Sequence, residues 1–157
     1  MKKITLFFLL ILLVISSCSS TKSAISSIKK HSKLDRIIIN AIEYEGTRYK
    51  YGGTTKRGMD CSGLIYTAFL KENIWLPRIS KMMATKGKNI SFRNIKRGDL
   101  LFFKTSRKNS INHVGLVTSV KNGKIRFVHS TTSRGVIVSS LSEKYWKRAY
   151  SKAKRIL

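Results

Sequence analysis

Three residues of this sequence have the types, and the order along the chain, that catalysis by a thiol nucleophile requires. They are Cys61, His113 and His129. A thiolate attacks a carbonyl carbon, a histidine removes the thiol proton, and a third polar group orients that histidine. Cys61 lies among polar and small residues in the segment 60–63, a setting that argues against an inert core cysteine. The sequence therefore predicts a cysteine-dependent hydrolase.

The start of the chain has the pattern of an export signal. Two lysines precede an apolar run at residues 4–15 that only Thr5 interrupts, and small residues follow, which predicts a secretory signal peptide at residues 1–17. The run is shorter than the about 20 residues that a membrane-spanning helix needs. Residues 15–18 resemble a bacterial lipoprotein cleavage site, which implies that Cys18 becomes the lipid-modified first residue. Uncleaved export and a plain signal peptide are the alternatives.

The remainder of the chain has room for one domain. Removal of residues 1–17 leaves 140 residues, enough for a single hydrophobic core. The segment 18–33 is rich in Ser, Thr and Lys, so we expect a flexible tether there and one catalytic domain at 34–157. If Cys18 carries lipid, Cys61 has no partner within the chain and no disulfide is expected. No spacing of His, Asp or Cys is typical of a zinc site, and we expect no metal or other cofactor.

The charge balance indicates a polyanionic partner. The chain has 32 Lys and Arg against 7 Asp and Glu, a net charge of +25, and loss of two lysines with the signal peptide would leave 30 against 7, or +23. An exported protein rarely meets nucleic acid, and we find no helix-turn-helix, zinc knuckle or aromatic-basic platform. Anionic lipid headgroups and a carboxylate-rich cell-wall polymer explain the charge better. A solvated surface that reflects composition alone is the alternative.

Two helices are expected to come before a sheet. Apolar residues at helical spacing predict the first from Leu34 to about Gly46 and a second from about Cys61 to Glu72. Cys61 would then lie at a helix N-terminus, where backbone N–H groups and the helix dipole lower the pKa of a thiol. The buried faces are predicted to contain Leu34, Ile37, Ile38, Ala41 and Ile42 in the first helix, and Leu64, Ile65, Ala68 and Phe69 in the second.

The second half of the chain has the pattern of strands. They are predicted at 100–103, 113–120, 124–130 and 135–139, with a last short helix at about 142–150. Helices followed by an antiparallel sheet predict an α+β fold class.

The hairpin between the second and third predicted strands decides whether the two histidines can meet. Asn122-Gly123 is a strong signal for a two-residue turn, which would place His129 opposite Leu116. The histidines would then lie three positions out of register. Because side chains alternate between faces, their rings would point to opposite sides of the sheet. A one-residue bulge or a longer turn would bring them to one face, and the catalytic hypothesis needs one of these.

Six segments, in this order, resemble the NlpC family of papain-like cell-wall peptidases over about residues 34–157. They are Tyr49-Lys50-Tyr51-Gly52-Gly53, Asp60-Cys61-Ser62-Gly63, Leu76-Pro77-Arg78, Gly98-Asp99-Leu100, His113-Val114-Gly115 and Phe127-Val128-His129-Ser130. Within the family the chain resembles the small murein endopeptidase lipoproteins related to Spr. The resemblance implies a papain-like fold, with N-terminal helices packed on a small antiparallel β-sheet, and hydrolysis of peptide bonds in peptidoglycan stems.

The resemblance also implies roles for the residues that match the family's motifs. Cys61 would be the nucleophile, His113 the general base and then the acid, and His129 the orienting residue. The hydroxyl of Tyr49 would hold the oxyanion together with the Cys61 amide. Positions near the substrate groove are matched by Asp60, Ser62 and Arg78. Ile79 stands directly after that arginine, where relatives have serine, so this loop departs from the family pattern.

The implied substrate bond is the peptidoglycan crosslink between D-alanine and diaminopimelate, cut by a D,D-endopeptidase. The bond between D-glutamate and diaminopimelate is the alternative on the same fold. An acyltransferase and a non-catalytic wall-binding lipoprotein are the other classes that the sequence leaves open. We expect a monomer in the cell envelope, with no nucleic acid partner and with its N-terminal lipid in the outer membrane, so that the domain faces the periplasm. In a Gram-positive host the anchor would be in the plasma membrane.

Overall fold

The structure is a computed structural model that describes residues 32–157 except residue 108. The predicted signal peptide, Cys18 and nearly all of the predicted tether lie outside the described residues. Within 32–157, none of the helices has the length and apolar character that crossing a membrane requires.

The described chain alternates short helices with strands. In chain order the elements are α3 (Lys33–Ile42), β1 (Thr54–Thr55), β2 (Gly58–Met59), α4 (Cys61–Leu70), α5 (Ser80–Met83), β3 (Lys88–Ile90), the 3-10 helix η1 (Phe92–Asn94), β4 (Leu100–Phe103), β5 (His113–Lys121), β6 (Lys124–Thr131), β7 (Gly135–Ser140), α6 (Lys144–Ala149) and β8 (Tyr150–Arg155).

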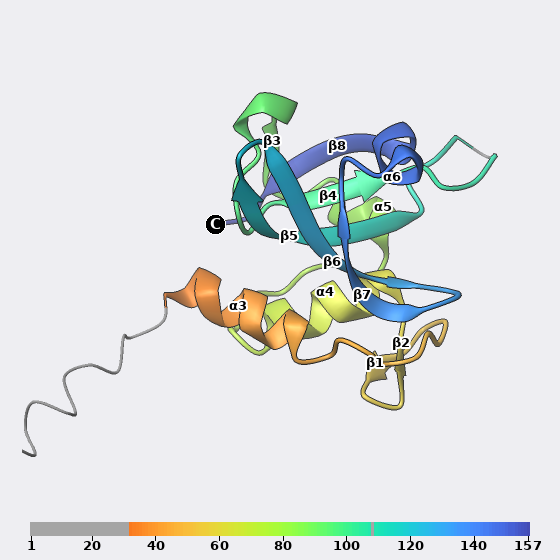
Figure 1. Cartoon of the computed structure of the whole chain (residues 1–157). Helices are drawn as coiled ribbons and strands as arrows, with labels where there is room; N and C mark the ends of the chain where they lie inside the picture. Colours follow the sequence, from red (N-terminus) through yellow and green to blue (C-terminus); the bar gives the residue numbers. More distant parts are fainter. Residues whose placement is uncertain (1–31, 108) are drawn as a thin grey trace, which may run out of the picture. The chain divides into compact units, whose positions relative to one another are not determined.

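Six strands form one antiparallel sheet in the order β3-β8-β4-β5-β6-β7, and β1 pairs with β2 in a separate hairpin. Helices α3 and α4 lie against one face of the six-stranded sheet, and α6 packs on the other (Figure 1). Side chains of the strands alternate between these faces, so that Phe102 packs with the helices while Leu101 and Phe103 pack with α6. This arrangement confirms the predicted α+β class.

Both predicted helices, α3 and α4, are present in the structure. α3 begins with a capping box, in which the Ser32 hydroxyl accepts the N–H of Asp35 at 3.1 Å and the Asp35 carboxylate accepts the N–H of Ser32 at 3.0 Å. Ile42, predicted to be buried, is 39% exposed because α3 ends there and the chain turns away toward Gly46. The predicted apolar face of α4 is fully buried, so the helix that begins with Cys61 is anchored in the core.

The hairpin of β5 and β6 contains the bulge that the catalytic hypothesis needs. Its turn at residues 122–123 has positive φ at both positions, 49° and 72°, as expected for Asn-Gly. Beyond the turn the pairing shifts by one residue at Thr118, so that Leu116 pairs with the residue before His129. The shift brings His113 and His129 to the same face of the sheet.

Several elements were not predicted from the sequence, namely β1, β2, α5, β3, η1 and β8. Strand β8 pairs with β3 on one side and with β4 on the other. A partly buried ion pair joins it to the start of β4, because Arg155 donates to the buried Asp99 carboxylate from Nε at 2.7 Å and from Nη2 at 2.9 Å. The segment after α6 is therefore part of the sheet's interior.

Candidate active site

Cys61 is the first residue of α4, and Asp60 before it is the N-cap. The Cys61 side chain is nearly buried, and its sulfur lies 4.0 Å from the backbone oxygen of Asn112. Burial raises the pKa of the thiol above its ordinary value, although nearby backbone N–H groups act in the opposite direction. The helix start therefore does not lower the pKa as expected, since loss of solvent outweighs it. Near pH 7 the resting thiol is protonated and needs a base.

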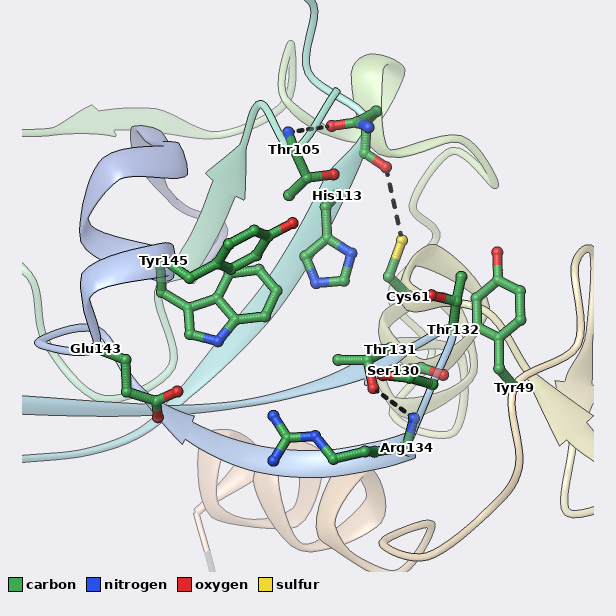
Figure 2. Close-up of a pocket in the computed structure, with 13 residues that line it drawn as sticks. Tyr49, Cys61, Thr105, His113, Ser130, Thr131, Thr132, Arg134, Glu143 and Tyr145 are labelled. Atoms are coloured by element: carbon green, nitrogen blue, oxygen red, sulfur yellow. Dashed lines mark hydrogen bonds between the residues drawn. The ribbon is translucent and has the colours of Figure 1, made fainter. Parts of the chain in front are cut away.

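His113 opens β5 and His129 lies in β6, and both side chains are buried. Nε2 of His113 and Nδ1 of His129 are 2.9 Å apart, with the ring planes at 89°. This bond leaves Nδ1 of His113 free for another partner, and Figure 2 shows a ring nitrogen of His113 on the side toward the Cys61 sulfur. The structure thus brings together the three residues that the sequence singled out.

Burial also determines the charge of the two imidazoles. It lowers the pKa of His113 to about 4. For His129, burial acts first and the positive charges of His113 and Arg134 add to it, which together lower the pKa to about 2. Both rings are neutral near pH 7, so His113 can accept a proton.

Tyr49 lies beside the thiol. An isolated backbone bridge to Met59 fixes the segment, and Figure 2 shows the Tyr49 ring next to Cys61. Burial, followed by the negative charges of Cys61 and Asp60, raises the pKa of the Tyr49 hydroxyl above its ordinary value. The hydroxyl therefore keeps its proton at neutral pH and can donate a hydrogen bond to an anion in the cleft.

Asp60, Ser62 and Arg78 form one hydrogen-bonded cluster at the start of α4. The Asp60 carboxylate accepts from Arg78 at 2.8 and 2.9 Å and from the N–H groups of Gly63 and Gly52, both at 2.7 Å. Arg78 also donates to the Ser62 hydroxyl at 2.9 Å. Burial would raise the pKa of Asp60, but the bonds to Arg78 and Gly63 outweigh it and lower that pKa. The cluster holds the Gly52 loop against α4. Part of the Arg78 side chain stays exposed and lines a pocket beside Cys61.

Two adjoining pockets meet at the thiol and share Tyr49, Cys61 and Asn112. The first, drawn in Figure 2, is lined by His113 and by the side chains of Arg134, Glu143, Tyr145 and Trp146. The second is lined by the Asp60 cluster and by Ile79. Together they form a groove that passes the nucleophile on both sides, which is the shape that an extended substrate requires.

Three further residues line the site and were not predicted from the sequence, namely Asn112, Arg134 and Trp146. Their positions depend on the register of the sheet and on the packing of α6, which no local pattern reveals. The adjacent aromatic residues Tyr145-Trp146 are the local signal that could have pointed to Trp146. In the part of the chain that the structure describes, no cluster of three or more His, Cys, Asp or Glu side chains could hold a metal ion.

Known proteins resemble this chain over most of the described residues. The model of the NlpC/P60 family matches residues 46–155. A probable endopeptidase NlpC homolog of Haemophilus influenzae is 46% identical over 116 residues, which are 73% of this chain and 58% of the relative. The murein DD-endopeptidase MepS/murein LD-carboxypeptidase of Escherichia coli is 39% identical over 123 residues, 78% of this chain and 62% of the relative. The chain thus matches about six tenths of the length of these relatives.

A further relative and a solved structure are also similar to this chain. The gamma-DL-glutamyl hydrolase of Bacillus subtilis is 36% identical over 113 residues, 71% of this chain and 26% of the relative. A crystal structure of an NlpC/P60 family protein from Bacillus cereus superposes with a TM-score of 0.71 at 28% identity, and covers 79% of this chain and 40% of that one.

Proposed function

The chain belongs to the NlpC/P60 family, and from this premise we propose that it is a cysteine endopeptidase that cleaves stem-peptide bonds of peptidoglycan. The observation that carries the proposal is the 2.9 Å bond between His113 and His129, with the free side of His113 turned toward Cys61 in one groove. A protonated thiol, a neutral imidazole and a second ring that orients it are the groups that acyl transfer to a cysteine requires.

The proposed reaction begins when the Cys61 thiol gives its proton to Nδ1 of His113 and the sulfur attacks the amide carbonyl. The electron pair of the C=O bond moves to oxygen, where the Tyr49 hydroxyl and the Cys61 N–H can donate to it. Each such donor lowers the barrier by about 3 kcal/mol. His113 then protonates the leaving amine as the C–N bond breaks, and water, deprotonated by His113, hydrolyses the thioester.

This route specifies the tautomer of each histidine. Nδ1 of His113 must be unprotonated, so the hydrogen on Nε2 is donated to Nδ1 of His129. His129 then carries its own hydrogen on Nε2, which is buried and has no hydrogen-bond partner among the described residues. His129 therefore acts as an acceptor that orients His113.

The two pockets receive the two parts of the substrate in this proposal. His113 must reach the leaving nitrogen, and it lines the first pocket, so the leaving fragment lies there. The acyl fragment lies in the second pocket, beside Ser62 and the exposed part of Arg78. These roles agree with those that the sequence resemblance implies for Asp60, Ser62 and Arg78, with Asp60 acting through its hydrogen bonds.

We propose the crosslink between D-alanine and diaminopimelate as the scissile bond, because the Escherichia coli relative is a murein DD-endopeptidase. The bond between D-glutamate and diaminopimelate is the second candidate, since similarity to the gamma-DL-glutamyl hydrolase favours a bond of D-glutamate.

The test compares the full chain in a non-ionic detergent with its Cys61→Ser variant on purified crosslinked murein, with products identified by liquid chromatography and mass spectrometry. Loss of crosslinked dimers to intact monomers, only with Cys61 present, would support the D,D-endopeptidase. Shortened stems would favour cleavage beside D-glutamate. Absence of products from both proteins would refute the enzyme and favour a wall-binding role. Transfer of the acyl group to an added amine would indicate an acyltransferase.

The envelope location is part of the same proposal. Residues 1–17 would be removed, Cys18 would carry the lipid, 18–33 would be the tether and 34–157 the peptidase domain, which acts as a monomer. The outer membrane, with the domain facing the periplasm, is the proposed site of the anchor. Mass spectrometry of the mature N-terminus tests the anchor, and an unmodified first residue at another position would refute it.

A further inference from the structure

Trp146 packs against both histidines of the candidate site. It lies in α6, is 5% exposed and lines the pocket on the His113 side. Its ring is stacked on His113, with the centroids 5.2 Å apart and the planes at 22°. Against His129 the centroids are 4.5 Å apart and the planes at 81°. A single indole therefore touches the flat face of one imidazole and stands nearly perpendicular to the other.

Aromatic packing replaces a hydrogen bond in orienting His129. Apart from the bond to His113, the His129 ring has no polar partner within the described residues. Phe127 lies on one side, at 4.6 Å between centroids and 34° between planes, and Trp146 lies across it. The ring that orients the proposed base is thus itself held by two aromatic side chains.

An imidazolium at His113 would have no carboxylate beside it. Among the described residues, neither histidine takes part in an ion pair. The titratable groups near His113 are Cys61 from α4, His129 from β6, and Tyr49 and Tyr145, which line the same pocket. Arg134 and Glu143 line the same pocket, from the β6–β7 turn and from the start of α6. The face of an indole within about 6 Å attracts a cation, and the attraction grows when water is excluded.

We propose that Trp146 is a positioning residue of the active site, whose indole holds both histidines and stabilises the charged His113 that forms when Cys61 transfers its proton. This inference rests on the proposed function for its catalytic meaning. The proton moves from sulfur to Nδ1 of His113, so that a thiolate and an imidazolium appear together. The indole face favours that ion pair over the neutral thiol and imidazole, and therefore speeds every reaction of the thiolate at neutral pH.

The test measures alkylation of Cys61 by iodoacetamide in the full chain, with peptide mapping to separate Cys61 from Cys18. Trp146→Leu should slow alkylation about tenfold at pH 7, and much less at pH 10, where hydroxide removes the thiol proton without His113. Trp146→Phe should lose about threefold at pH 7, because a benzene ring binds a cation more weakly than an indole. Trp75→Leu is the matched control, since Trp75 is 76% exposed and packs on Tyr66.

The outcomes separate a positioning role from a structural one. Equal slowing at both pH values, or no slowing at pH 7, would overturn the proposal, as would the same pH-7 loss in Trp75→Leu. If Trp146→Leu does not fold, as judged by thermal unfolding, the Phe variant decides by the same criterion. On crosslinked muropeptides, Trp146→Phe should lower kcat with KM within about twofold. Alkylation needs no substrate, so it tests Trp146 even where murein cleavage fails.

Discussion

Mild acid should destabilise the folded protein through its two buried histidines. The folded-state pKa values, about 4 for His113 and about 2 for His129, lie below the value of about 6.5 for an exposed histidine. Between these limits the unfolded chain binds protons that the folded chain does not. The contribution of the two neutral rings to the free energy of unfolding is therefore fully present above about pH 6.5 and decreases as the pH falls.

The size of this effect follows from the same values. At pH 5 an exposed histidine is almost fully protonated, whereas both buried rings are almost neutral. Each buried histidine therefore lowers the free energy of unfolding by about 2 kcal/mol between pH 7.5 and pH 5. Together they remove about 4 kcal/mol, a large share of the roughly 5–15 kcal/mol that stabilises a typical domain. Near pH 5 the free energy of unfolding should fall by about 2 to 3 kcal/mol for each pH unit.

Urea unfolding of the full chain at constant ionic strength, followed by circular dichroism between about pH 7.5 and 5, measures this free energy directly. The matched variant is His129→Asn, which keeps an acceptor for His113 but cannot be protonated. For this variant, the fall in the free energy of unfolding per pH unit near pH 5 should be about half of that for the unsubstituted chain. The reasoning would be refuted if the free energy of unfolding of the unsubstituted chain fell by less than about 1 kcal/mol over this range. Equal pH dependence in the two chains would refute it as well.

Three substitutions test other parts of the site. Tyr49→Phe should lower kcat on crosslinked muropeptides about 100-fold through loss of one oxyanion donor, with alkylation of Cys61 unchanged; unaltered kcat would remove the hydroxyl from the site. Arg78→Ala should cost about 2 kcal/mol in urea unfolding, because the Asp60 carboxylate loses its guanidinium, and equal stability would contradict this bracing role. Gly63→Ala should lower Tm by several degrees, since its Cβ would lie 2.0 Å from a backbone oxygen; an unshifted Tm would count against this close packing.

The local elements of the site could be predicted from the sequence because their signals are local. Apolar periodicity identified α3 and α4, and Asn122-Gly123 located the turn of the hairpin. The alternation of side chains even showed that a bulge or a longer turn was needed. It could not place the bulge at Thr118, because the position of an extra residue depends on how both faces of the sheet pack.

Long-range contacts explain what the sequence did not reveal. The segment Tyr150–Arg155 has the polar sequence Tyr-Ser-Lys-Ala-Lys-Arg, and only pairing with β3 and β4 makes it a strand. The pKa of Cys61 was misjudged for a similar reason: the helix start was visible in the sequence, whereas the burial that outweighs it comes from distant strands. Trp146 meets the histidines only because α6 folds back over the sheet.

The position of β8 bears on how the protein is made. β8 is the last strand along the chain, yet it lies between β3 and β4, so a gap one strand wide persists until its residues are available. While these residues are still within the ribosome, Asp99 also lacks its arginine. The six-stranded sheet therefore cannot be completed before residues 150–155 have been made. Without them β3 has no neighbouring strand and β4 pairs only with β5, so a chain shortened before Tyr150 would lose both edges of this junction.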